Sequence, residues 1–200
     1  MHALRFTLRV SCSHSRELSM ELNTKQMYEL MIAGVGGKGV LTIGKLLAEA
    51  AQENFSNVLY FPNYGPAMRG GDCECTVVFS NQPITSPVIY EVPLAIIMDQ
   101  SAFEAFRGRL KKGAEVFIDS TVIPMKIERQ DIAAIYVPAT KMAMDLGSAQ
   151  VANLVLLGAF LEKTKALPLS SINKALDNVL LGTRRESLLQ LNKSALQNGA

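Results

Sequence analysis

From Tyr28 onward, short apolar runs alternate along the chain with amphipathic segments. The runs typical of β-strands are Tyr28–Ala33, Asn57–Phe61, Glu74–Phe79, Leu94–Met98, Glu115–Asp119 and Ala134–Val137. Apolar residues at helical spacing mark Gly37 to about Asn54, Ser101–Leu110, Ala149–Lys163, Ser170–Leu180 and Thr183–Gln197. Strands that alternate with helices predict right-handed crossovers and a mainly parallel sheet with helices on both faces. The predicted fold class is therefore α/β, a Rossmann-like three-layer sandwich.

Two segments depart from this alternation. The loop at residues 62–71 joins two strand-like runs with no helix between them, which predicts that these strands pair antiparallel or lie at a sheet edge. Residues 81–93 contain three prolines and are predicted to be an extended excursion over the surface. Neither segment has the character of a linker, so we expect residues 28–200 to form a single domain.

Residues 1–27 are interpreted as an N-terminal extension. Leu4, Phe6, Leu8 and Val10 alternate with polar positions that include arginines, a period of two that is typical of a half-buried strand. We expect this strand to pair with a sheet edge of the same chain or of a partner. An alternative is an organellar transit peptide, because the segment is rich in arginine and serine and poor in acids.

Composition narrows the possible functions. With 48% hydrophobic residues among 200, the chain can bury the core of one domain. Twenty basic and 18 acidic residues are mixed along the chain, which argues against a nucleic-acid partner or an anionic membrane. The longest apolar stretch, Val151–Leu161, is shorter than the ~20 residues that span a bilayer. Three cysteines without a CxxC pair fit the reducing cytoplasm, and they are too few for a four-cysteine iron–sulfur cluster.

The first motif with chemical meaning is GVGGKGV at residues 34–40, between a predicted strand and a predicted helix. Glycines at positions 34, 36 and 39 permit a tight turn, and the free N–H groups of the following helix favour an anion. Lys38 would add a positive charge. The alternative is that the glycines only allow close packing of helix on strand. We predict an anion-binding or partner-binding turn made of Gly34, Gly36, Gly37, Lys38 and Gly39.

A dinucleotide site would also need an acidic residue at the end of the second strand, to bind the ribose hydroxyls. That strand ends in Tyr60, Phe61 and Pro62, and the nearest acids, Glu49 and Glu53, fall earlier, on the intervening helix. The sequence therefore disfavours an NAD-dependent dehydrogenase and favours another phosphate-bearing ligand or a protein surface at the glycine turn.

The second motif is the loop FPNYGPAMRGGD at residues 61–72. Its glycines and prolines define bends that hold Arg69 near the second one. A guanidinium offers several donors to a phosphate or carboxylate, while Tyr64 offers apolar contact. We predict that Tyr64, Arg69 and Gly70 lie near the glycine turn. The alternative is a structural loop in which Arg69 pairs with Asp72 or another carboxylate.

These two motifs together carry a family resemblance. The segments GVGGKGVLTIGKLLAEAA and FPNYGPAMRGGDCECTVVFSNQPITSP, followed by NLVLLGAF and LNKSALQNGA, resemble the gamma subunit of 2-oxoacid:ferredoxin oxidoreductases, the family of the pyruvate and 2-oxoglutarate enzymes. The likeness covers residues 28–200, and the cysteine-bearing strand after the loop is more similar to the 2-oxoglutarate type. Lys38, Ala67 and the Asp72-Cys73 pair differ from the residues usual in the family.

The resemblance implies an accessory subunit of an enzyme that decarboxylates a 2-oxoacid, transfers the acyl group to coenzyme A and reduces ferredoxin. Thiamine diphosphate and iron–sulfur clusters would sit on alpha, beta and ferredoxin-like partner subunits, with coenzyme A as a possible ligand at the shared interface. The isolated chain would bind no cofactor stably, would be inactive and could form a homodimer. Alternatives are the beta subunit of indolepyruvate ferredoxin oxidoreductase and a free-standing nucleotide- or coenzyme A-binding protein.

Other polar residues are interpreted structurally, and no catalytic or metal-binding residue is predicted. Asp99 and Asp119 follow strands, where such residues commonly cap a helix or turn. Asn153, in an apolar helix, requires a partner if it is buried, either a backbone carbonyl or another subunit. Cys73 and Cys75 alternate on one strand and are expected to be buried thiols. Met142 and Met144 in KMAMD are interpreted as a pliable contact surface.

Overall fold

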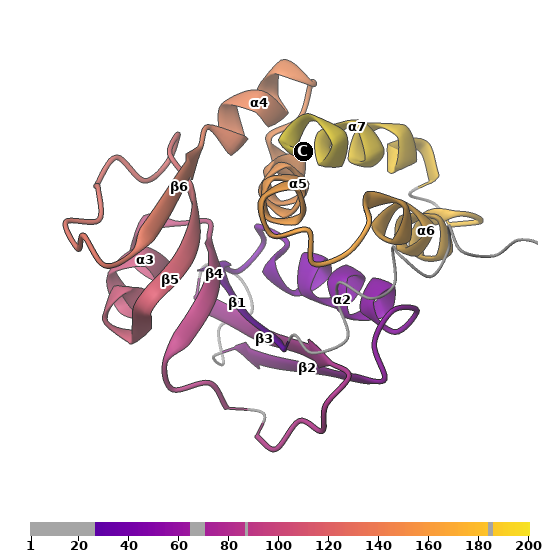
Figure 1. The fold of residues 1–200 in the computed structure, drawn as a ribbon. Coiled ribbons are helices and arrows are strands. Elements are labelled where there is room, and N and C mark those ends of the chain that lie inside the picture. The colour runs from indigo at the N-terminus through magenta and orange to yellow at the C-terminus, as the bar shows by residue number, and fades with distance from the viewer. Residues whose placement is uncertain (1–26, 65–70, 87, 184–185) are drawn as a thin grey trace, which may run out of the picture.

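The computed structural model describes residues 27–64, 71–86, 88–183 and 186–200. Its strands are β1 (Tyr28–Val35), β2 (Asn57–Tyr64), β3 (Asp72–Ser80), β4 (Val92–Ile97), β5 (Leu110–Asp119) and β6 (Ala133–Val137). Its helices are α2 (Val40–Ala51), α3 (Gln100–Phe106), α4 (Ala139–Asp145), α5 (Ala152–Thr164), α6 (Leu169–Leu180) and α7 (Leu189–Gly199). Together they form a mixed sheet between helical layers (Figure 1), which confirms the predicted α/β class.

The strands lie side by side in the order β2-β3-β1-β4-β5-β6. Strands β1, β4, β5 and β6 pair in parallel, whereas β3 runs antiparallel to both of its neighbours, β1 and β2. The antiparallel pair after the loop at 62–71 and the position of β2 at the sheet edge confirm the sequence prediction. A connection without a crossover helix can join only antiparallel neighbours, because a parallel pair needs a long return path.

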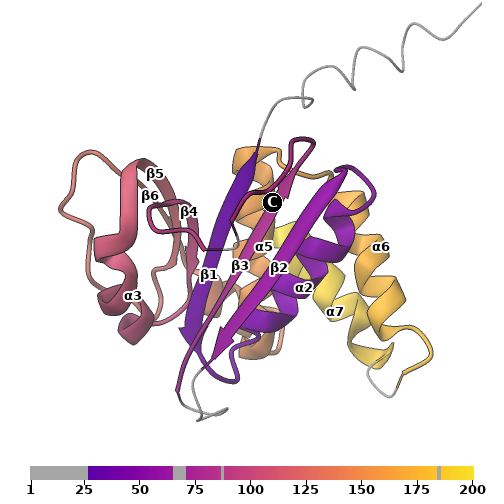
Figure 2. The same ribbon diagram turned by 90° about the horizontal axis from the view of Figure 1, so that it is seen from below.

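The helices are distributed unequally over the two faces of the sheet. Helices α2, α5, α6 and α7 cover one face, and α3 lies on the other (Figures 1 and 2). Side chains of β1 alternate between the two layers: Leu30 and Ile32 join the core under the larger helical layer, and Met31 and Ala33 join the core under α3. A central strand buried on both faces has to be apolar at nearly every position.

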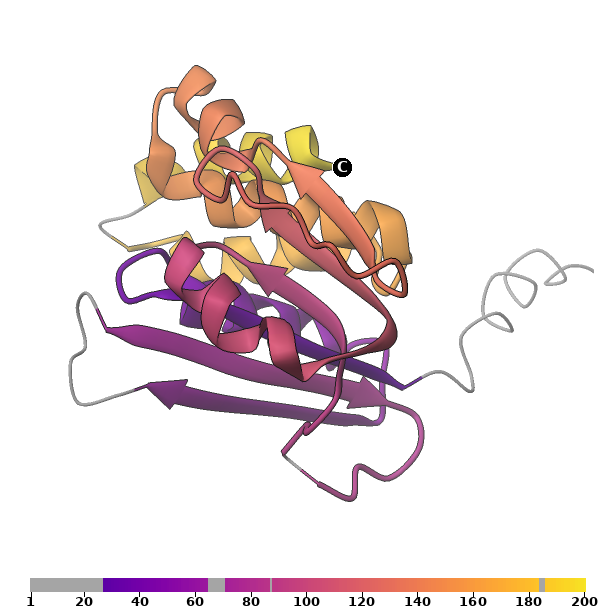
Figure 3. The ribbon, with the colours of Figure 1, turned by 90° about the vertical axis from the view of Figure 1, so that its left-hand side faces the viewer.

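Several element boundaries differ from the sequence expectation. Helix α2 begins at Val40 and not at Gly37, because Gly37 and Gly39 have positive φ angles of 103° and 79° that end the turn before the helix. Helix α4, which contains the KMAMD segment, was not predicted, and Met144 on it is exposed. The β5–β6 connection, residues 120–132, contains no helix and runs over the α3 face (Figure 3).

No helix in the described parts of the chain combines the length and the apolar character that crossing a membrane requires. The prediction of a strand in residues 4–10 concerns residues outside the described ranges, and so it stays a prediction.

Candidate functional site

The glycine turn forms the connection from β1 to α2 at the carboxyl end of the central strand. The Lys38 N–H donates to Val35 O at 3.2 Å and closes the turn, and Gly39 is the N-cap of α2 in the left-handed region. Because only glycine enters that region without steric cost, the spacing of glycines in the sequence dictates this backbone path.

The glycines differ in what surrounds them. A Cβ on Gly39 would lie 2.2 Å from Asn153 Nδ2, and one on Gly34 would lie 3.1 Å from Val40 Cγ2 and 3.2 Å from Met98 Cβ. At these two positions the absence of a side chain permits close packing, which is the alternative role that the sequence offered for the glycines. A Cβ on Gly37, in contrast, would meet nothing within 4 Å, so this glycine serves the backbone conformation and leaves open space above the turn.

The turn lies at the topological switch point of the sheet. From β1 the chain passes through α2 to β2 on one side, and from β4 it passes through α3 on the opposite face to β5 on the other side. In open α/β sheets, ligands bind at the carboxyl ends of the strands where the order reverses in this way. The gap between the ends of β1 and β4 is therefore the expected location of a site.

Lys38 spans this gap. Its Nζ donates to Met98 O at 3.1 Å and pairs with Asp99 Oδ2 at 2.8 Å, so one side chain joins the β1–α2 turn to the β4–α3 turn. The Asp99 carboxylate also accepts from Ser101 N at 3.0 Å and caps α3, as the sequence predicted. Burial opposes ionisation of Asp99, but hydrogen bonds from Lys38 and Ser101 outweigh it and lower the pKa of the carboxyl.

The base of the arginine loop touches the glycine turn. Gly36 N–H donates to Gly71 O at 2.9 Å, and Val35 is paired with Asp72 across the β1–β3 ladder. Arg69 and Gly70, together with the side chain of Tyr64, lie outside the described residues. The structure thus brings the described end of the loop beside the turn, and the roles of these three residues stay predictions.

Two pockets open on either side of the turn and share Gly37, Lys38, Gln150 and Asn153. The larger, which we call the helical groove, has a volume of about 570 Å³ and extends past Thr42 between α2, α6 and α7. Its apolar wall is formed by Leu46, Val151, Leu154, Leu176, Val179, Leu180, Leu188 and Leu191. The smaller, which we call the strand-end pocket, measures about 280 Å³ and reaches the ends of β4 and β5.

Asp119 forms part of the strand-end pocket and is 2% exposed. Its carboxylate accepts from Thr121 N at 3.1 Å, Thr140 N at 3.2 Å and the Thr140 hydroxyl. These donors hold the first turn of α4 against the end of β5, so the sequence interpretation of Asp119 as a capping residue is correct. Thr140 and Gln150 were missed in the sequence, because only the fold places these isolated polar residues beside the turn.

Asn153 is 7% exposed and connects α5 to the glycine turn. Its Nδ2 donates to Gly39 O at 3.4 Å, and its Oδ1 accepts from Leu154 N at 2.8 Å. The sequence prediction of a backbone-carbonyl partner for this buried amide is therefore confirmed. Its contact with Gly39 fixes the wall that the two pockets share.

Cys73 and Cys75 are buried on the face of β3 that packs under α2. Burial raises the pKa of both thiols above the usual range, and Cys75 Sγ contacts Val40 O at 3.6 Å. Within the described residues, no three His, Cys, Asp or Glu side chains are grouped closely enough to hold a metal ion. We therefore interpret both thiols as packing groups of the core.

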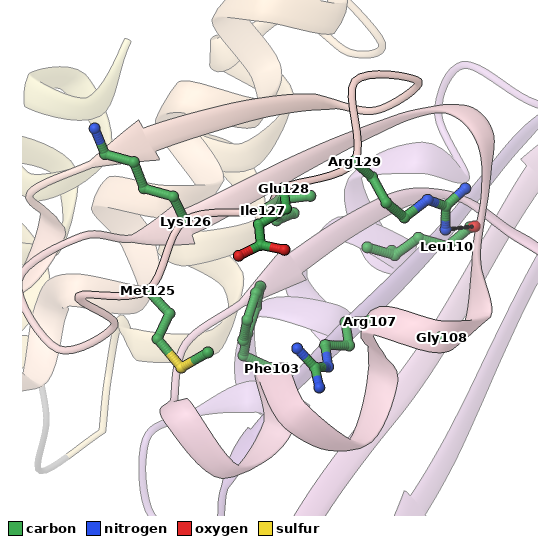
Figure 4. Close-up of a pocket in the computed structure, with 9 residues that line it drawn as sticks. All are labelled: Phe103, Arg107, Gly108, Leu110, Met125, Lys126, Ile127, Glu128 and Arg129. Atoms are coloured by element: carbon green, nitrogen blue, oxygen red, sulfur yellow. Dashed lines mark hydrogen bonds between the residues drawn. The ribbon is translucent and has the colours of Figure 1, made fainter.

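A separate pocket of about 330 Å³ lies on the α3 face and contains none of the predicted site residues. The residues that line it include Phe103, Leu110, Met125 and Glu128 (Figure 4). The Arg129 side chain lies beside Leu110 and donates to Leu110 O at 2.9 Å (Figure 4). The pocket is distinct from the glycine turn in both position and chemistry.

Comparison with known proteins connects this geometry to a family. A family model described as pyruvate ferredoxin/flavodoxin oxidoreductase matches residues 29–200. The chain belongs to this family. Among curated relatives, the 2-oxoglutarate synthase subunit KorC of Methanocaldococcus jannaschii is 30% identical over 173 residues, which cover 84% of this chain and 92% of that protein. The ketoisovalerate oxidoreductase subunit VorA of Methanothermobacter marburgensis is also 30% identical, but this chain spans only 35% of it.

Solved structures of the family share the architecture. The gamma subunit of a keto/oxoacid ferredoxin oxidoreductase from Geobacter sulfurreducens superposes with a TM-score of 0.73 and 28% identity, covering 87% of this chain and 94% of that one. A 2-oxoglutarate:ferredoxin oxidoreductase from Magnetococcus marinus gives a TM-score of 0.79 at 21% identity, over 88% of this chain and 30% of that one. These similarities confirm the resemblance inferred from the glycine turn and the arginine loop.

Proposed function

We propose that this chain is the gamma subunit of a multi-subunit 2-oxoacid:ferredoxin oxidoreductase, with 2-oxoglutarate as the favoured substrate. The overall reaction converts 2-oxoglutarate and coenzyme A to succinyl-CoA and carbon dioxide, and the released electrons reduce ferredoxin or a similar acceptor. The observation that carries the proposal is the glycine turn at the switch point, open on two sides, in a chain of this family. Similarity over 92% of a 2-oxoglutarate synthase subunit supports the role as a gamma subunit, and the preference for 2-oxoglutarate rests on the cysteine-bearing strand after the arginine loop.

The residues described here do not fit an iron–sulfur cluster. Cys73 and Cys75 are two buried cysteines, whereas such clusters are held by four cysteine ligands. In the proposed assembly the clusters and thiamine diphosphate are therefore held by alpha, beta and ferredoxin-like subunits. The free thiols also support a cytoplasmic location.

The glycine turn does fit an anionic group of coenzyme A. Gly37 leaves open space above the backbone, Lys38 provides an ammonium group, and Thr42 adds a hydroxyl at the mouth of the helical groove. When bound, coenzyme A supplies the thiol that accepts the acyl group. The function of this chain is to orient that ligand and to exclude water at the subunit interface, with Arg69, Gly70 and Tyr64 completing the face.

Exposed apolar side chains support a covered face beside the groove. Val179 and Leu188 line the helical groove and are 36% and 42% exposed, and neighbouring Leu181 is 51% exposed. Such clusters on a chain of this size mark interaction surfaces. We propose that a partner subunit buries them in the assembled enzyme.

Reconstitution tests this function directly. The full chain, produced alone, should not oxidise 2-oxoglutarate, whereas co-expression with alpha, beta and ferredoxin-like subunits should give coenzyme A-dependent reduction of ferredoxin. An Arg69→Ala variant should raise the KM for coenzyme A while the complex still assembles. Turnover by the chain alone would refute the accessory role.

Two alternatives predict different partners. A beta subunit of indolepyruvate ferredoxin oxidoreductase would restore activity with indolepyruvate and not with 2-oxoglutarate. A free-standing nucleotide- or coenzyme A-binding protein would bind its ligand alone and would not co-purify with the other subunits. Mass spectrometry of the affinity-purified complex, followed by a panel of 2-oxoacids, separates these cases.

A further inference from the structure

One ammonium group faces both pockets at the glycine turn. Among the described residues that line the helical groove and the strand-end pocket, Lys38 is the cationic side chain. The other charged residue that lines them is Asp119, whose carboxylate is already occupied by the donors of Thr121 and Thr140. Within the described part of the chain, Lys38 is therefore the side-chain counter-charge available to an anionic ligand in either pocket.

Lys38 already has a counter-ion within the chain. Asp99 lies 2.8 Å from its Nζ, and the two side chains are 21% and 37% exposed, respectively. Lys38 lines both pockets, and the exposed fractions of the two side chains leave the pair accessible to solvent. The backbone carbonyl of Met98, at 3.1 Å, holds the same ammonium in this position.

We infer that Asp99 limits the anion affinity of the proposed site: its carboxylate engages Lys38 in the free chain and competes with an anionic ligand for the same ammonium. The inference rests on the proposed function, because it assumes that an anionic ligand binds at the glycine turn. Every anion that takes up Lys38 has to displace this carboxylate. The competition thus lowers the affinity of the site for anions in general.

The size of the effect follows from the exposure of the pair. Partly exposed ion pairs contribute modestly, so releasing Lys38 from Asp99 should raise anion affinity about two- to fivefold. The gain should shrink as ionic strength rises, because mobile ions screen charges at the surface.

The variant Asp99→Asn removes the negative charge of residue 99 without disturbing the fold. Asparagine is as good an N-cap as aspartate, so α3 keeps its cap from residue 99 to Ser101 N. Lys38→Met removes the ammonium and keeps an unbranched side chain of similar length. The double variant then completes a cycle that measures how far the two effects depend on each other.

Titration calorimetry of the full chain with inorganic pyrophosphate provides the test. We expect tighter binding for Asp99→Asn, weaker binding for Lys38→Met, and no gain from Asp99→Asn once Lys38 is replaced. Unchanged or weaker binding in Asp99→Asn would overturn the inference. An equal gain in affinity from Asp99→Asn in the Lys38→Met background would also overturn the inference, because Asp99 would then act by general charge repulsion. The inference would fail as well if none of the chains bound pyrophosphate.

A matched control removes the same charge elsewhere. Asp131 pairs with Arg129 at 2.8 Å near the start of β6, at the opposite end of the strands. Asp131→Asn should leave pyrophosphate affinity unchanged. The proposed function fails separately: a chain that shows this competition but restores no 2-oxoacid oxidation with its partners would refute the enzyme assignment alone, and the reverse result would refute the inference alone.

Discussion

Replacement of Gly39 by alanine should be costly for two separate reasons. The residue has a φ of 79°, where a side chain costs about 1–2 kcal/mol. The added Cβ would also lie 2.2 Å from Asn153 Nδ2. Overpacking of a well-filled site costs typically about 1–3 kcal/mol, so the total loss in free energy of unfolding should be about 2–5 kcal/mol.

Gly37→Ala is the matched comparison within the same turn. Its φ is 103°, but a Cβ there meets nothing within 4 Å. Only the backbone strain remains, so the expected loss is about 1–2 kcal/mol. In an Asn153→Ala background, the cost of Gly39→Ala should fall to the same level, because the opposing amide is gone.

Urea denaturation followed by circular dichroism measures these differences. Each kcal/mol lost from the free energy of unfolding should also lower the melting temperature by about 2–4 °C for a domain of this size. If Gly39→Ala were no more destabilising than Gly37→Ala, or if Asn153→Ala gave no relief, the close packing of α5 on the turn would not be the source of the cost.

Three further predictions concern the rest of the scaffold. Gly158→Ala should destabilise the chain by at least about 2 kcal/mol in denaturant, because its Cβ would lie 2.1 Å from the rigid backbone oxygen of Leu196; a neutral effect would contradict the α5–α7 contact. Asp119→Ala should cost about 1–3 kcal/mol and loosen α4, measured as faster amide exchange at Thr140, since buried donors lose their acceptor; unchanged exchange would argue against this anchor. The pKa of Asp99 is lower in the folded chain than in the unfolded chain, where it is about 3.9. Asp99 therefore stabilises the fold above about pH 3.9, and this contribution is lost as pH falls through the folded pKa. Asp99→Asn should remove this part of the dependence of the free energy of unfolding on pH.

Sequence patterns were sufficient where a local rule decides the structure. The alternation of strand and helix predicted the α/β class, and the missing helix in the loop at 62–71 predicted the antiparallel pair. Asp99 as a helix cap followed from its place between an apolar strand and a serine. Helix α4 escaped prediction because it is short and because its first turn is anchored by a hydrogen bond from Thr140 to Asp119, two residues 21 apart in the chain.

The sequence by itself determined that the chain folds as a strand–helix alternation with a glycine turn after its first strand, because backbone conformation and periodicity are local properties. It also carried the family resemblance, through motifs of fixed spacing. Tertiary structure alone decided that β3 lies between β1 and β2, that Asn153 packs on Gly39, and that Lys38 bridges to Asp99. These contacts join residues distant in the chain, and their partners are selected by which strand ends meet at the switch point of the sheet.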